Sequence, residues 1–198
     1  PCSKVSTAGT NVRPLGCALD SFGALYVTDT LNRVAMYFPG VVVQNGANYL
    51  TRMAPGLVST LSSRNLNYSF TDLTKVFNEL PNPIPMPRTL GDLQVLINDV
   101  PVPLYFVSPF QINFLMPNDA PSSGTVELQV VQPSTGRIIA ATQVNMDVAS
   151  PAFFTIGSTG TGQIAALNQD NSVNSDTNQA RGGQVIQLFA TGAGTIPT

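Results

Sequence analysis

The stretch FVSPFQINFLMP, from Phe106 to Pro117, decides how the middle of the chain folds. Apolar and polar side chains alternate along it. This period of two is typical of a β-strand, whose successive side chains point to opposite faces. We expect the large apolar side chains to face a core; they are Phe110, Ile112, Phe114 and Met116. The opposite face would carry Gln111, Asn113 and Leu115, and it is a candidate contact face for another subunit.

Similar strand-like segments, each bounded by Pro, Gly, Asn or Ser, follow one another along most of the chain. Upstream of the quoted stretch, residues 41–43 and 57–61 have this character, separated by an Asn45-Gly46 turn signal. From Leu93 onward we expect strands at 93–97, 102–107, 110–116, 125–132, 137–147, 152–156, 163–167 and 184–191. This spacing predicts an all-β fold made of antiparallel, immunoglobulin-like β-sandwich regions.

One segment has the period of a helix instead. Its apolar residues fall at positions i, i+3, i+4 and i+7; they are Leu73, Val76, Phe77 and Leu80. Ser69 or Thr71 can cap the start, and Pro81 ends the pattern. The sequence therefore predicts a short helix near residues 71–80.

The composition excludes several classes of partner. Of the 198 residues, 10% are charged and 43% hydrophobic, and the net charge is −2. The nine cations are scattered, which argues against nucleic acid and anionic membranes, because both need clustered basic residues. No apolar run reaches the roughly 18 residues of a membrane-spanning helix. The chain starts at Pro1 and has no signal peptide, so we expect it to be trimmed or cut from a longer precursor.

Catalytic chemistry finds little support in the residues. The chain has no histidine, which removes the Ser-His-Asp triad, histidine metal ligands and the commonest general base. Lys4 and Lys75 are the only lysines, and neither lies in a nucleophile turn. No two carboxylates have a spacing that indicates glycoside hydrolysis, although such pairs are assembled in space. We predict a protein that is not an enzyme and has no cofactor.

A polar loop at residues 168–179 offers oxygen ligands for Ca²⁺. The candidate ligands are Asp170, Asn171, Asn174 and Asp176. Calcium takes six to eight oxygens, but this spacing fits no EF-hand and no bidentate Glu follows. The alternative is a hairpin loop in which Asn and Asp form turns. We favour the hairpin loop.

The two cysteines, Cys2 and Cys17, can close one loop in an oxidising compartment. The alternative is a pair of unbonded, buried thiols. Without a histidine the two make a poor zinc site.

Residues 19–38, LDSFGALYVTDTLNRVAMYF, resemble one NHL-type β-propeller repeat. The matching positions are Asp20, Gly23, Leu25, Tyr26, Val27, Asp29, Asn32, Arg33 and Val34. One repeat cannot close a propeller, because several blades are needed to bury the inner faces. We therefore expect residues 1–40 to form a blade-like β segment.

Residues 41–198 resemble the uncharacterised C-terminal domain of large secreted proteins from Solibacter-type acidobacteria. The resemblance rests on the ordered motifs PMPRTLGDLQVLINDVPVPLYFVSPFQINFLMP, SPAFFTI and AALNQDNSVNSDTNQARGGQVIQLFATGAG. It implies an immunoglobulin/TIG-like sandwich at 41–150, the start of a second, incomplete sandwich at 151–198, and an extracellular location. The family continues with further strands after ATGAGTIP, where this chain stops.

Incomplete sheets expose unpaired N–H and C=O groups, which another subunit can cover by adding a strand. The sequence therefore favours an extracellular structural protein that assembles with copies of itself into a filament or surface layer. One alternative is an experimental or proteolytic fragment whose sheet edges are simply exposed or are covered within the chain. The other is a non-catalytic binding or adhesion module, for polysaccharide or a cell surface, of a larger secreted protein.

Overall fold

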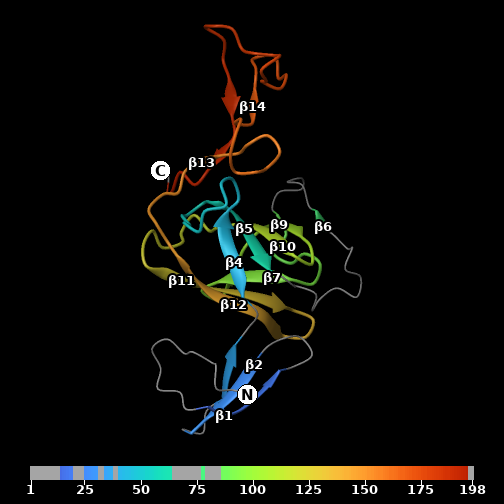
Figure 1. Cartoon of the computed structure of the whole chain (residues 1–198), viewed down its shortest axis with the longest axis vertical. Coiled ribbons are helices and arrows are strands. Elements are labelled where there is room, and N and C mark those ends of the chain that lie inside the picture. Colours follow the sequence, from blue (N-terminus) through green and yellow to red (C-terminus); the bar gives the residue numbers. More distant parts are fainter. Residues whose placement is uncertain are drawn as a thin grey trace.

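A computed structural model describes residues 14–19, 25–30, 34–37, 40–63, 77–78 and 86–195. Within these ranges every regular element is a β-strand, and the strands pair in antiparallel sheets. Figure 1 shows a three-stranded sheet at one end, two larger sheets in the middle and a C-terminal segment at the other end. The all-β prediction is confirmed for the described residues.

The N-terminal sheet has the order β1-β2-β3. Its strands are β1 (Pro14–Leu19), β2 (Leu25–Asp29) and β3 (Val34–Tyr37). Val27, in the central strand, is fully buried, whereas Leu15, Leu19 and Val34 are exposed. These residues form strands, as the all-β prediction requires, and the likeness to a propeller blade stays a prediction.

A five-stranded sheet has the order β4-β5-β10-β9-β6. Its strands are β4 (Val41–Asn45), β5 (Val58–Ser63), β10 (Gln111–Leu115), β9 (Leu104–Val107) and β6 (Phe77–Asn78). The short helix predicted near residues 71–80 is not borne out. Phe77 and Asn78 pair with Val107 and Phe106, so sheet pairing holds these two residues extended. The rest of that segment lies outside the described residues.

A four-stranded sheet has the order β12-β11-β7-β8. Its strands are β12 (Arg137–Asn145), β11 (Thr125–Gln132), β7 (Gln94–Ile97) and β8 (Val100–Pro101). Asn98 and Asp99 join β7 to β8 with φ angles of 46° and 65°. Positive φ at both positions is what a two-residue hairpin turn requires, and Asn and Asp tolerate it well.

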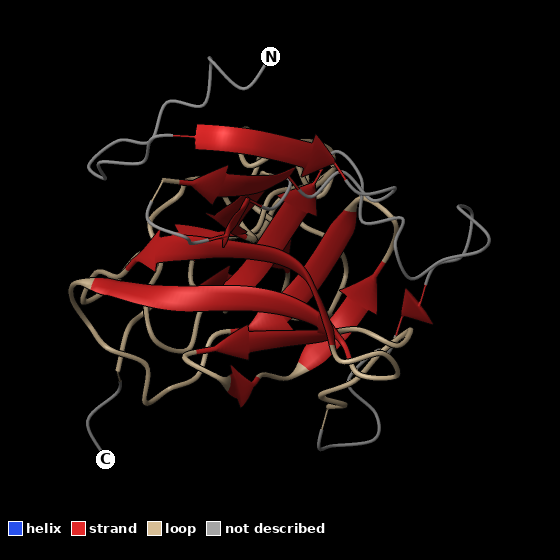
Figure 2. Ribbon diagram, turned by 90° about the horizontal axis from the view of Figure 1, so that it is seen from below, coloured by secondary structure: helices blue, strands red, loops and turns tan. Residues whose placement is uncertain are grey.

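These two sheets share one hydrophobic core and form two layers (Figure 2). We call them the two-sheet body, residues 41–146. From the first sheet the core takes Val43, Leu61, Leu104, Ile112 and Phe114; from the second it takes Val95, Ile97, Leu128, Val130, Ile139 and Val144. Every second residue of β10 and β11 enters this core, as the alternation in sequence predicts.

The C-terminal segment, residues 151–195, contains two sheets of two short strands each. β13 (Ala152–Phe153) pairs with β16 (Ala190–Thr191), and β14 (Ala166–Leu167) pairs with β15 (Gln187–Leu188). The predicted strands at 152–156, 163–167 and 184–191 are thus present only as two-residue pieces. Across the described part of the chain, no helix is long and apolar enough to cross a membrane.

Candidate functional site

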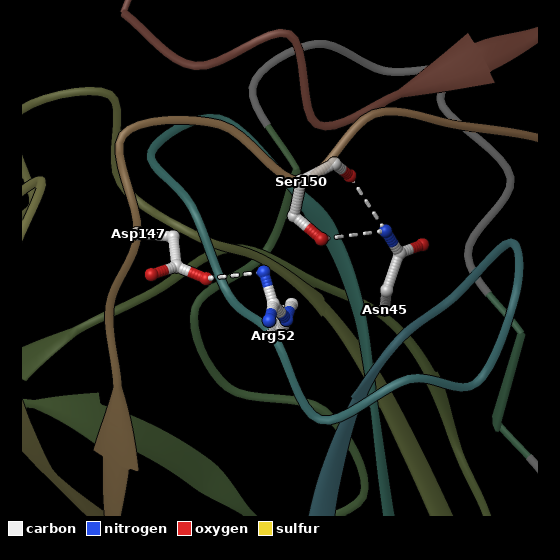
Figure 3. A network of polar contacts seen from close by, with 4 residues as sticks. All are labelled: Asn45, Arg52, Asp147 and Ser150. Atoms are coloured by element: carbon white, nitrogen blue, oxygen red, sulfur yellow. Dashed lines mark hydrogen bonds and ion pairs between the residues drawn. The ribbon is translucent and has the colours of Figure 1, made fainter.

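The C-terminal segment meets the two-sheet body at a joint built around Asn45 (Figure 3). The Asn45 side chain is fully buried at the end of β4. Its Nδ2 donates to the carbonyl oxygen of Ser150 at 2.8 Å and lies 3.4 Å from the Ser150 hydroxyl, while its Oδ1 accepts from the Ala47 N–H at 2.9 Å. Nearby, Arg52 and Asp147 form an exposed ion pair at 3.8 Å.

The returning strand reaches the same joint. Thr191 accepts a hydrogen bond from the Val58 N–H at 2.8 Å through its Oγ1, and the Ser150 N–H donates to the Gly192 carbonyl at 2.9 Å. A methyl group on Gly192 would lie 2.0 Å from the Ser150 oxygen, and one on Gly194 would lie 2.2 Å from the Val148 oxygen. Only glycine allows the two main chains to approach this closely.

A second contact lies on the loop after β4. The Tyr49 hydroxyl donates to the carbonyl of Ser158 at 2.8 Å, and Gly160 packs against Tyr49. Burial, with a smaller contribution from Tyr49, raises the pKa of the neighbouring Tyr105 far above its usual value. Tyr105 is therefore a neutral packing residue at ordinary pH and not a proton donor or acceptor.

The C-terminal segment exposes an unusual amount of apolar side chain. Residues 181–190 are all exposed, and Val185 keeps 69% of its surface open to solvent. The exposed apolar set of the segment is Phe153, Ile156, Ile164, Val173, Val185, Ile186, Leu188 and Phe189. Two-stranded pieces of this length have too little buried surface to be stable by themselves. We therefore treat these exposed apolar residues as a candidate interaction surface.

A groove with a cavity of about 830 Å³ runs between the body and the C-terminal segment. Its lining combines Gly56, Val58, Asn118, Asp119 and Pro151 with residues 190–195. A smaller cavity of about 420 Å³ lies beyond the same 118–119 loop, next to Arg88, Val100 and Leu115. Arg88 is held there by a hydrogen bond to the Pro101 carbonyl.

The predicted contact face lies on the outer side of β10. Gln111, Asn113 and Leu115 are half-buried, and Asn113 Oδ1 accepts from Gln111 Nε2 at 2.8 Å and from Thr60 Oγ1 at 3.1 Å. On the other face, Ile112, Phe114 and Met116 are fully buried. The two polar side chains are thus hydrogen-bonded to each other. A subunit-contact role for this face stays a prediction.

Phe110 departs from the expected pattern, because 53% of its surface is exposed. It lies in a turn before β10, where the Ser108 hydroxyl accepts hydrogen bonds from the N–H groups of Phe110 and Gln111. The strand alternation therefore begins one residue later than the sequence indicates.

The calcium candidates lie in a loop that is closed by its own hydrogen bonds. Asn168, nearly buried, is its centre: Asn174 Nδ2 donates to Asn168 Oδ1 at 2.8 Å, and Asn168 Nδ2 donates to the Asn178 carbonyl at 3.0 Å. Asp170 accepts from the hydroxyl and N–H of Ser172, and these bonds lower the pKa of its carboxyl. The arrangement is that of a self-contained polar loop.

The other candidates, Asn171 and Asp176, lie exposed on the same loop. Among the described residues, no three His, Cys, Asp or Glu side chains gather as metal ligands would. Cys17 lies on β1 as a disulfide-bonded residue, whereas Cys2 falls outside the described residues. The pairing of Cys2 with Cys17 therefore stays a prediction.

Sequence reasoning missed the joint. Asn45 is read locally as a turn residue, and nothing near it in sequence points to Ser150. The available signal was the glycine spacing in ATGAG, residues 190–194, which indicates close main-chain approach. Comparison of the chain with protein-family models, with curated proteins and with solved structures finds no match.

Proposed function

We propose that this protein is an extracellular, non-catalytic structural protein that assembles with copies of itself by adding strands at exposed sheet edges. The observation that carries the proposal is the exposed apolar set of the C-terminal segment, above all residues 185–189. Pairing with a strand of another subunit would cover these side chains and would also give hydrogen-bond partners to main-chain N–H and C=O groups at the sheet edge.

The opposite end of the chain supports a head-to-tail arrangement. The three-stranded sheet has two outer strands, β1 and β3, that pair on one side only within the described residues, and it exposes Leu15, Leu19 and Val34. If the exposed surface at one end of a subunit binds the different surface at the opposite end of the next subunit, the contact is heterologous. Such contacts build a ring where the rotation closes and a filament where it does not, and we propose the filament.

The proposed extracellular compartment rests on three points. A disulfide-bonded Cys17 fits an oxidising environment. The resemblance to domains of secreted proteins points the same way, as does the low content of charged residues. In this proposal residues 1–40 are an NHL-like blade, residues 41–150 an immunoglobulin-like sandwich, and residues 151–198 part of a second one.

Electron microscopy and light scattering of the purified chain test the proposal. We expect uniform fibres or sheets, and we expect Val185→Lys to suppress them because it places a charge in the interface. Val100→Lys is the matched control, since Val100 is also an exposed valine but lies in β8 of the body. A wild-type chain that stays a monodisperse monomer at high concentration overturns the proposal.

A binding module for polysaccharide is the second candidate. It is supported by the half-buried amides of Gln111 and Asn113, of which Asn113 pairs with the half-buried Phe106 in the neighbouring strand. Amides and aromatic rings together suit sugar hydroxyls and sugar faces. A pull-down on insoluble glycans tests this, with Gln111→Ala expected to reduce retention. Equal retention of the variant, or none of the wild type, rejects it.

A further inference from the structure

The groove between the body and the C-terminal segment carries a more specific inference, which rests on the proposed function. We propose that this groove accepts residues 184–189 of a second copy as an added strand. Its cavity of about 830 Å³ lies within the range of established ligand pockets, roughly 300–1,000 Å³. The occupant we assign is a peptide strand of this same protein.

The lining of the groove suits a main chain. Ala190, Ala193 and Thr195 are small and exposed, so their side chains leave room for an approaching strand. Within the described residues, the N–H groups of Ala193, Gly194 and Thr195 donate no hydrogen bond. Unsatisfied donors beside small side chains are what an added strand requires.

The proposed donor has the matching properties. Val185, Ile186, Leu188 and Phe189 are exposed, and in this stretch only Gln187 and Leu188 pair with a neighbouring strand. Burying these apolar side chains in a groove lined mostly by small, uncharged residues would be favourable. No aromatic residue lines the groove, so a sugar would find no ring to stack on. A peptide strand therefore fits better than a polysaccharide.

Charge gives the pairing a direction. Asp119 is the only charged residue that lines the groove among the described residues. Arg181 lies four positions before Val185 and is the one charged residue between positions 177 and 195. Both side chains are exposed, and neither forms an ion pair within the described part of the chain. A second copy laid into the groove can bring these opposite charges together.

A labelled peptide with the sequence of residues 181–190, RGGQVIQLFA, tests the groove on the full-length chain. Fluorescence anisotropy should show saturable binding. Asp119→Lys should weaken binding about 3- to 10-fold, as expected for a partly exposed charge pair whose sign is reversed. A peptide carrying Arg181→Glu should regain binding to that variant. Asp176→Lys is the matched control, an exposed carboxylate on a distant loop.

The outcomes separate this inference from the proposed function. If the peptide does not bind, the groove assignment is overturned, even if the wild-type chain forms fibres. The same holds if the Asp119→Lys and Asp176→Lys variants bind the peptide equally and the Arg181→Glu peptide gives no rescue. Saturable, rescuable binding by a chain that forms no fibres supports the groove and overturns self-assembly. Circular dichroism of each variant confirms that it is folded.

Discussion

The side-chain amide of Asn45 donates a 2.8 Å hydrogen bond to the main-chain carbonyl of Ser150, across 105 residues of sequence. This bond ties the end of β4 to the point where the chain leaves the two-sheet body. Asn45 is fully buried, so its amide must find partners inside the protein. It finds them on Ser150 and on Ala47, and no water is needed at this position.

Replacing Asn45 by alanine should therefore destabilise the protein. The Ser150 carbonyl and the Ala47 N–H would lose their partners, which we expect to lower the free energy of unfolding by about 1–3 kcal/mol. Urea denaturation followed by circular dichroism measures the change. Asn145→Ala, at an exposed position at the end of β12, is the control. Equal effects of the two substitutions would contradict the assigned role.

Gly192→Ala should detach the C-terminal segment while leaving the body folded. The added methyl group would lie 2.0 Å from the Ser150 oxygen, and the φ angle of 81° is itself unfavourable for alanine. Limited proteolysis should cut residues 151–191 faster in this variant. Gly182→Ala serves as the control, because a methyl group there meets nothing within 4 Å. Identical cleavage rates would show that the joint tolerates the change.

Two phenylalanines four residues apart should differ sharply in their contribution to stability. Phe114 is fully buried in the core, so Phe114→Ala should cost about 3–5 kcal/mol. Phe110 is more than half exposed in the preceding turn, so Phe110→Ala should cost less than about 1 kcal/mol. Urea midpoints of the two variants measure the difference. Similar midpoints would place Phe110 in the core as well.

The hydrogen bonds to Asp92 should make stability depend on pH. The Ser134 hydroxyl, with help from Gln132 Nε2 and the Ser134 N–H, lowers the pKa of the Asp92 carboxyl, against a smaller opposing effect of burial. A lowered folded pKa stabilises the protein above the unfolded value, near 3.9, and this contribution is lost as pH falls through the folded value.

Ser134→Ala removes the largest of these contributions. We expect it to lower the urea midpoint at pH 6 and to have a smaller effect at a pH below the lowered folded pKa, where the carboxyl is protonated in both states. Ser123→Ala, an exposed serine in a loop of the same body, is the control. A Ser134→Ala effect that is the same at both pH values would mean that the hydroxyl acts independently of the Asp92 charge.

The outer face of β10 can be tested for a role in assembly. Replacing Gln111 and Asn113 by lysine should leave folding intact, because both lie on the outer face and the core residues are untouched. If this face contacts another subunit, the two added charges should block fibre formation. Electron microscopy would then show no fibres of the variant. Fibres of unchanged appearance and yield would reject that role and leave the C-terminal segment as the contact surface.

Alternation in the sequence predicted the longer strands of the two-sheet body, but not β6 or the two-residue β8. Asn113 in β10 and Glu127 and Gln129 in β11 each separate two core residues, so the period of two is clear there. The pattern around Leu73 and Phe77 misled because its helical spacing is short, and Phe77 and Asn78 instead pair with β9. Tertiary pairing can override a local period of this length.

The C-terminal segment shows what alternation cannot predict. Residues 184–191 have the composition of a strand, yet their pairing is limited to Gln187–Leu188 and Ala190–Thr191. Strand propensity indicates an extended main chain but not a partner, which comes from another part of the sheet. The link between Asn45 and Ser150 was invisible for the same reason, because it joins positions that no local window contains.

The joint also determines how the protein would carry tension. Residues 151–191 leave the body at Ser150 and return at Gly192, and the Ser150 N–H is bonded directly to the Gly192 carbonyl. A pull on the far end of this segment, applied by an assembled neighbour, therefore falls on the bonds at Asn45, Val58 and Ser150 and on the Tyr49–Ser158 contact. Under load the segment should peel away at this point first, while the two-sheet body behind it stays intact.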